Sequence, residues 1–207
     1  MSFFNRIKAF IKQESEEQIA GYSVSELKAV FTVTSTIMNR RLPEYPKAVS
    51  LEGLGIPAFY VSFLIDTKDT SVFLALATSN FTYKSEKIFN ELPAKQYVND
   101  EKNEQLVFFL STREFNSTTV RMVTNSIDFL NVLSHEKFPT PPPWTVFDGY
   151  NPSWWGGDMQ GAQGYYNDNY FLPFFTQLSD TEKQEYYARF EATDEWIKSL
   201  TLTYDNE

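Results

Sequence analysis

The segment 138–175 constrains the fold more than any other part of the chain, because aromatic residues, prolines and glycines are concentrated in it. It holds twelve aromatic residues, six of the ten prolines and five of the eight glycines of the 207-residue chain. Prolines and glycines at this density interrupt regular helices and paired strands. Disordered linkers contain few rings. We therefore expect a long, ordered, irregular segment that its aromatic side chains hold in place.

The residues before this segment predict a mixture of helices and strands. Ser23 and Glu26 form a Ser-x-x-Glu capping box, so a helix begins there, and apolar residues at helical spacing continue it until Pro43 and Pro46. Alternating apolar residues predict three strands, at 58–66, 71–78 and 105–111, and the first two are joined by a turn at 66–70. Helical spacing predicts further helices at 3–12, 86–92 and 117–134.

A domain boundary falls at the proline-rich stretch 138–143, FPTPPP, which we expect to be extended. Beyond the aromatic segment, a second capping box at Ser179 and Glu182 predicts two short helices, 180–191 and 194–200. The fold class predicted is α+β: an antiparallel sheet faced by helices in a core of residues 1–138. The aromatic, acidic extension 139–207 packs on this core and ends in helices. The order of elements is loosely similar to that of type III secretion chaperones.

Composition excludes several classes of site. The chain has no cysteine and a single histidine, His135, so disulfides, thiolate chemistry and multi-histidine metal sites are excluded. No apolar run approaches the roughly 20 residues that span a bilayer, and Arg6, Lys8 and Lys12 interrupt the apolar residues of the first helix. We expect a cytoplasmic protein without a membrane span. The first helix either packs on the body of the protein, which we favour, or lies on a membrane surface.

Charge is distributed unevenly between the two parts of the chain. The net charge is −9, and residues 139–207 contain eleven Asp and Glu against three Lys and Arg. Residues 1–138 are close to neutral, with 16 acidic and 15 basic residues. A field of this sign repels nucleic-acid phosphates and attracts a protein with a basic face, although acidity also keeps a surface soluble. We therefore expect a protein partner and no nucleic acid.

The candidate binding residues lie in the aromatic segment. Tyrosine and tryptophan are enriched at the energetic centres of protein interfaces, and neighbouring carboxylates favour a basic partner. Most of the twelve rings should hold the segment on the core, and a minority should be exposed. Glycines flank a Trp-Trp and a Tyr-Tyr pair, which makes these four rings the best candidates for exposure. The predicted partner-binding residues are Trp154, Trp155, Asp158, Tyr165, Tyr166, Asp168 and Tyr170.

Catalytic readings are less specific. Asp148, Asp158 and Asp168 lie among rings, as carboxylates do in glycosidases, so a carbohydrate-binding or glycoside-hydrolysing site within 144–170 is an alternative. His135 has no nucleophile motif beside it. The glycines of 156–164 lack the lysine of a phosphate loop, and 167–169 lacks the pattern of a calcium loop. We assign no catalytic residue, metal or cofactor.

The extension resembles the C-terminal parts of a known class of small bacterial proteins. PPW at 142–144, WWGG at 154–157 and PFF at 173–175 are followed by LSDTE at 178–182, YY at 186–187 and Trp196. Over about 65 residues, this spacing of aromatic residues looks like that of the immunity proteins of polymorphic toxin systems. The resemblance implies a cytosolic inhibitor that blocks its toxin by direct binding.

The sequence thus predicts a non-enzymatic, acidic protein that neutralises a partner protein by steric and electrostatic blocking. A carbohydrate-active protein is the first alternative. A secretion-chaperone-like adaptor, which would bind its client through 23–135, is the second.

Overall fold

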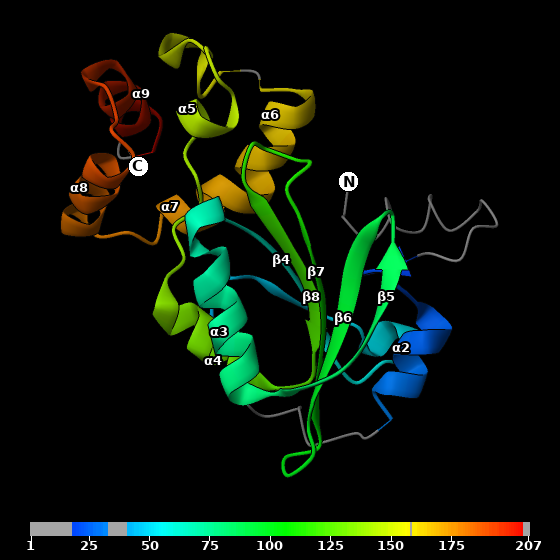
Figure 1. Cartoon of the computed structure of the whole chain (residues 1–207). Coiled ribbons are helices and arrows are strands. Elements are labelled where there is room, and N and C mark those ends of the chain that lie inside the picture. Colours follow the sequence, from blue (N-terminus) through cyan, green and yellow to red (C-terminus); the bar gives the residue numbers. More distant parts are fainter. Residues whose placement is uncertain (1–17, 33–40, 158, 205–207) are drawn as a thin grey trace.

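The computed structural model of the chain describes residues 18–32, 41–157 and 159–204, so the helix expected at 3–12 and Asp158 lie outside it. Its framework is a six-stranded antiparallel sheet with the strand order β3-β4-β8-β7-β6-β5 (Figure 1). The strands are Ala48–Ser50 (β3), Phe59–Ile65 (β4), Thr82–Phe89 (β5), Leu92–Asn99 (β6), Glu104–Ser111 (β7) and Thr118–Thr124 (β8). The predicted α+β class, an antiparallel sheet faced by helices, is confirmed.

Helices α3 (Thr70–Asn80) and α4 (Ile127–Glu136) cover one face of the sheet (Figure 1). Phe73 and Ala77 of α3 are one helical turn apart and fully buried. They belong to the larger apolar cluster, together with every second residue of the central strands, such as Val61, Phe63 and Met122. Since side chains alternate across a strand, the residues between them point to the opposite face.

The opposite face is covered at one end by the N-terminal part of the chain. A short hairpin of β1 (Gln18–Ile19) and β2 (Tyr22–Ser23) leads into helix α2 (Val24–Val30), and the 3₁₀ turn η2 (Glu52–Leu54) lies in the same layer. The capping box of Ser23 and Glu26 is present as predicted. However, α2 ends at Val30, where Phe31 turns out of the helix with φ −101° and ψ 73°, instead of continuing toward Pro43.

The extension consists mainly of short helices, so the expectation of an irregular segment holds only for its connecting loops. The elements are α5 (Pro143–Val146), the 3₁₀ turn η4 (Pro152–Trp154), α6 (Gly161–Tyr166), the π-helical turn η5 (Asn167–Phe171), α7 (Leu172–Phe175), α8 (Asp180–Arg189) and α9 (Asp194–Tyr204). Their buried rings join the apolar cluster under α3 and α4. Phe174 meets Tyr45 at 5.6 Å between ring centroids, and the Tyr186 hydroxyl donates to the Thr140 carbonyl at 2.6 Å.

The strand predicted at 71–78 is wrong, because these residues form α3. Apolar residues fill 72–77 without a break, so the sequence has little bias toward one helical face, and this ambiguity hid the helix. The turn expected at 66–70 is instead the start of this helical region: the Asp66 side chain accepts a hydrogen bond from the Lys68 amide and opens the 3₁₀ turn η3 (Thr67–Asp69). The strand predictions at 58–66 and 105–111 are confirmed as β4 and β7.

Two predicted helices are also corrected. Residues 86–92 form the hairpin between β5 and β6, whose two turn residues Asn90 and Glu91 have φ of 48° and 64°, as a tight hairpin turn requires. Residues 117–134 divide into β8 and α4. The break comes at Ser126, whose hydroxyl accepts from the Phe129 amide and caps α4. Val120 and Val123 fit a helical stripe, but the β-branched run before Asn125 favours a strand.

Candidate functional site

Of the two neighbouring indoles of Trp154 and Trp155, one is exposed to solvent and the other is buried in the core. Trp154 ends the turn η4 and is 66% exposed, whereas Trp155 is 4% exposed. The Asn151 side chain caps η4 by accepting from the Ser153 amide, and the chain then extends at Trp155. The Trp155 indole N–H donates to the Tyr204 hydroxyl at 2.9 Å, which fixes the buried ring against α9. The prediction of an exposed ring is right for Trp154 and wrong for Trp155.

The Tyr165–Tyr166 pair behaves in the same way. Neighbouring residues of a helix point in directions about 100° apart, so α6 buries Tyr166 completely and leaves Tyr165 51% exposed. The Tyr166 hydroxyl donates to the Pro141 carbonyl, and its burial raises its pKa well above the ordinary value. Tyr166 is therefore a core residue that ties α6 to the proline-rich stretch, and its predicted role at the surface is wrong.

Tyr170 is also buried, at 1% exposure, and this corrects its prediction as a partner-binding residue. Its hydroxyl is hydrogen-bonded to the Ser62 hydroxyl of β4 at 3.1 Å. Burial raises the pKa of Tyr170 above its ordinary value, and Tyr165 adds to the rise. Tyr170 thus connects the extension to the sheet.

The two exposed rings are the ends of a continuous row of aromatic side chains, which we call the aromatic strip. From Trp154 the strip passes to Tyr150, Phe147 and Phe115, and it ends at Tyr165. The successive ring centroids are 6.1, 6.3, 6.2 and 6.3 Å apart. The three middle rings are half-buried, so the core supports the strip from below. Phe115 comes from the loop between β7 and β8, and no signal in the sequence placed it beside the extension.

Exposed carboxylates occur on the same elements as the strip. Asp148 follows α5 and Asp168 lies in η5, and both side chains are exposed. Within the ranges that the structure covers, neither forms an ion pair. Arg189, one of the few cations of the extension, instead contacts Asp69 at 2.7 Å and Asp66 at 3.8 Å, at the start of the α3 region. Asp148 and Asp168 therefore add negative charge close in sequence to rings of the strip.

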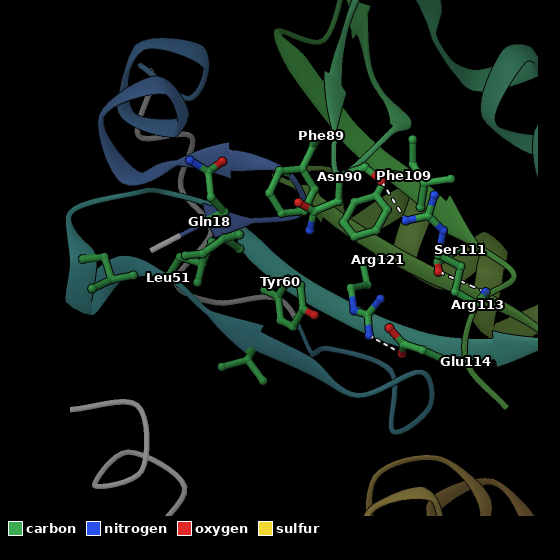
Figure 2. A pocket seen from close by; sticks show the side chains of 16 residues that line it. Gln18, Leu51, Tyr60, Phe89, Asn90, Phe109, Ser111, Arg113, Glu114 and Arg121 are labelled. Atoms are coloured by element: carbon green, nitrogen blue, oxygen red, sulfur yellow. Dashed lines mark hydrogen bonds and ion pairs between the residues drawn. The ribbon is translucent and has the colours of Figure 1, made fainter. Parts of the chain in front are cut away.

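A groove on the sheet face opposite α3 and α4 was not predicted. Two cavities of about 500 Å³ and about 720 Å³ lie between the N-terminal layer and η5, and both are lined by Val49 and Tyr60. We call them together the sheet groove. Figure 2 shows the side chains around the first of them.

A row of three paired strand residues, Ser62, Arg121 and Phe109, crosses the floor of the sheet groove. In the strand register, Ser62 of β4 pairs with Arg121 of β8, and Arg121 pairs with Phe109 of β7. The Arg121 guanidinium donates to Glu114 at 2.5 Å and lies 5.7 Å from the Phe109 ring centroid (Figure 2). Burial works to lower the pKa of Arg121, but Glu114 outweighs this and raises it, so the cation is permanent.

Tyr60 and Arg113 add two further polar side chains to the lining. Burial raises the pKa of Tyr60, and nearby Arg121 opposes this rise. Arg113, at the mouth, donates to the Asn90 carbonyl at 3.0 Å and to Glu91 at 2.8 Å. The sequence did carry one signal for this site, because Arg121 is a lone charge inside the apolar strand β8.

The candidate catalytic side chains within the described residues, His135, Asp148 and Asp168, are all exposed. His135 is exposed on α4 and its Nδ1 contacts the Asn131 carbonyl at 2.6 Å, within its own helix. In the part of the chain that the structure covers, no three His, Asp or Glu side chains gather as metal ligands. Asp148 and Asp168 lie on separate elements, and no hydrogen bond joins them.

Comparison of the chain with models of protein families, with curated proteins and with solved structures gives no match. Among the helices of residues 18–32, 41–157 and 159–204, none is sufficiently long and apolar to cross a bilayer. Functional inference therefore rests on the aromatic strip and the sheet groove themselves.

Proposed function

We propose that the chain is a non-catalytic binding protein that recognises a partner protein through the aromatic strip and the carboxylates around it. The observation that carries the proposal is the exposure of Trp154 and Tyr165 at the two ends of a strip that the core supports. Large rings on a rigid base lose little conformational freedom on binding, and such rings dominate interface energies. Asp148 and Asp168 favour a partner with a basic face.

The resemblance of the extension to immunity proteins gives the partner its proposed class. In this proposal the chain acts in the bacterial cytoplasm and neutralises a toxin by covering its active surface or holding it inactive. The rings would fill pockets of the toxin, while the carboxylates would speed the encounter and contribute a dependence on salt.

The test begins with the proteins encoded beside the gene for this chain. Each is purified and titrated against the chain, and a neutralised toxin is identified by loss of its activity at a stoichiometry of one chain per toxin. The double variant Trp154→Ala/Tyr165→Ala should then weaken binding by about a hundredfold or more, since a single hot-spot ring contributes about 2 kcal/mol or more. Unchanged affinity of this variant would refute the aromatic strip as the recognition surface.

Point variants are needed because deletion of 139–207 would remove part of the core. Phe171 and Phe175 are fully buried in the cluster that also contains Phe63 and Phe73. A truncated chain would fail to bind because it misfolds, whichever surface binds. A secretion-chaperone-like adaptor, which uses 23–135, predicts that the Trp154/Tyr165 double variant binds its client normally.

A carbohydrate ligand is the competing proposal that the exposed Trp154 indole also supports, because indoles stack on sugar faces. Asp148 lies between Phe147 and Tyr150, two rings of the strip. A glycan array separates the two proposals: the protein-binding proposal predicts no saturable glycan signal. The carbohydrate proposal predicts one that Trp154→Ala abolishes and Asp148→Asn reduces.

A further inference from the structure

The sheet groove has the chemistry of a ligand site that is separate from the aromatic strip. Its two cavities, of about 500 Å³ and 720 Å³, fall in the size range of small-molecule sites. Their linings lack Trp154 and share only Tyr165 with the strip. Variation of the groove floor therefore tests this site without removing the surface proposed above.

The lining of the groove is cationic, although the chain as a whole carries −9. Among the described residues, it contains Lys47, Arg113 and Arg121 against one carboxylate, Glu114. Glu114 compensates Arg121 directly. The partner of Arg113 is Glu91, whose side chain is 85% exposed, and an exposed ion pair of this kind contributes only about 0–1 kcal/mol. An incoming acid can therefore replace Glu91 at little cost.

The walls of the groove are flat and apolar. Phe89 and Phe109 meet at 5.6 Å between ring centroids, and Leu51, Leu54 and Leu92 complete this end. Tyr60, Tyr165 and Tyr170 line the other cavity and add phenol groups. A ring or a short alkyl chain of a ligand would bury its faces between these side chains.

The position of a charged side chain, Arg121, in the interior of the sheet also requires an explanation. Arg121 lies on β8, which has β4 on one side and β7 on the other, and its side chain is only 20% exposed. Glu114 comes from the loop after β7, so the ion pair closes one side of the guanidinium (Figure 2). Phe109 supports the group from the neighbouring strand. The cation is thus held in the lining of the first cavity, and its strand partner Ser62 lines the second.

We propose that the sheet groove binds an organic anion with a flat apolar body. Arg121 and Arg113 contact the acid group, and the rings of Phe89, Phe109 and Tyr60 enclose the body. Uncharged molecules of the same shape bind more weakly, because they offer no anionic acceptor to the remaining N–H groups of the two guanidinium side chains.

Two fluorescent probes with the same ring skeleton test the proposal on the full chain. Anilinonaphthalene sulfonate carries an acid group, and phenylnaphthylamine lacks it. We expect the sulfonate to bind the folded protein at one site per chain. Its affinity should be about tenfold higher than that of the neutral probe, because its acid group forms a charge-assisted hydrogen bond that the neutral probe cannot form. Absence of saturable binding, or equal affinity for both probes, would overturn the proposal.

Single substitutions test whether the probe binds in the sheet groove. Arg121→Gln should lower the affinity for the sulfonate about tenfold and leave the neutral probe within about twofold. The matched control is Lys102→Gln, which also removes an ion-paired cation, here one that contacts Asp128 of α4 at 3.2 Å on the other sheet face. It should leave both affinities unchanged. Equal effects of the two variants would show that only overall charge matters, and this would contradict the site.

The double variant Glu114→Gln/Arg121→Gln keeps the test valid if Arg121→Gln alone leaves Glu114 without its partner and unfolds the protein. It keeps the net charge and should still lose the preference for the sulfonate. If the folded double variant retains the full preference, the proposal is wrong. Partner binding through the strip should survive in this variant, so failure of the groove proposal is distinguishable from failure of the proposed function.

Discussion

Replacement of Trp155 by alanine is expected to cost about 3–5 kcal/mol of folding free energy, which is the range for a buried tryptophan. The structure supports the upper half of this range. The ring is 4% exposed and lies 5.9–6.3 Å, centroid to centroid, from the rings of Phe147, Tyr150, Tyr166, Phe171 and Trp196. A buried tryptophan removes about 150–250 Å² from water, which at about 25 cal/mol per Å² is worth about 4–6 kcal/mol.

The lost hydrogen bond adds to this cost. Trp155 donates to Tyr204, whose hydroxyl in turn donates to Asn167 at 2.6 Å. Removal of the indole leaves the Tyr204 hydroxyl without its donor and costs about 1 kcal/mol more. Relaxation of the surrounding rings offsets part of the sum, so a value near 4–5 kcal/mol is expected.

The adjacent residue provides the matched control. Trp154→Ala removes the same side chain from a position that is 66% exposed, so stability should change by no more than about 0.5 kcal/mol. Chemical denaturation followed by far-ultraviolet circular dichroism measures both variants. Equal losses for the two variants, or a loss below about 1 kcal/mol for Trp155→Ala, would refute the assignment of one ring to the core and the other to the surface.

Three further predictions concern pH and backbone. Burial raises the pKa of Tyr166 and Tyr186, so above pH 10.0 these phenols ionise in the unfolded chain but stay neutral in the folded protein. The free energy of unfolding should then fall by about 1.4 kcal/mol per pH unit for each of the two tyrosines. In alkaline denaturation, Tyr166→Phe should remove the share of one tyrosine from this fall. The Lys137 ammonium and the Ser179 cap lower the pKa of Glu182 from 4.5 to about 2, so the Glu182 carboxylate stabilises the fold fully above pH 4.5, and this stabilisation is lost as the pH falls toward 2. Glu182→Gln should therefore make the melting temperature depend less on pH between 4.5 and 2. An unchanged pH dependence would contradict this. Gly156 has φ 89°, and a Cβ there would lie 2.4 Å from the Thr203 hydroxyl; Gly156→Ala should cost about 1–3 kcal/mol in thermal unfolding, and a neutral result would contradict the close packing of this turn on α9.

The sequence correctly predicted those helices whose starts are determined by hydrogen bonds between residues close in sequence. Both capping boxes are present, at Ser23 and Ser179, because the bonds they make lie within four residues of sequence. The helices after Ser179 were predicted for the same reason. By contrast, α3 and the hairpin of β5 and β6 depend on neighbours far along the chain. Their short apolar patterns fit both helix and strand, and tertiary packing decides between them.

The site could be predicted in part. The sequence indicated which segment presents exposed rings, and in each of the pairs Trp154–Trp155 and Tyr165–Tyr166 one ring is indeed exposed. The sequence could not show which ring of each pair is exposed, because a shift of one residue in the local backbone would exchange the buried and the exposed position. The position of Phe115 gave no signal in the sequence, and the sheet groove gave only the lone charge Arg121 in β8, since strand pairing and the β7–β8 loop bring their residues together.

Recognition through the aromatic strip is tested by comparing two double variants that remove similar exposed side chains from different parts of the molecule. Trp154→Ala/Tyr165→Ala removes both ends of the aromatic strip. Tyr83→Ala/Ile88→Ala removes residues that are 52% and 69% exposed on the edge strand β5. Calorimetric titration with the neutralised partner measures the dissociation constant of each.

We expect a loss of about a hundredfold or more for the strip variant and less than about threefold for the edge variant. The reverse order, or equal losses, would contradict recognition through the aromatic strip.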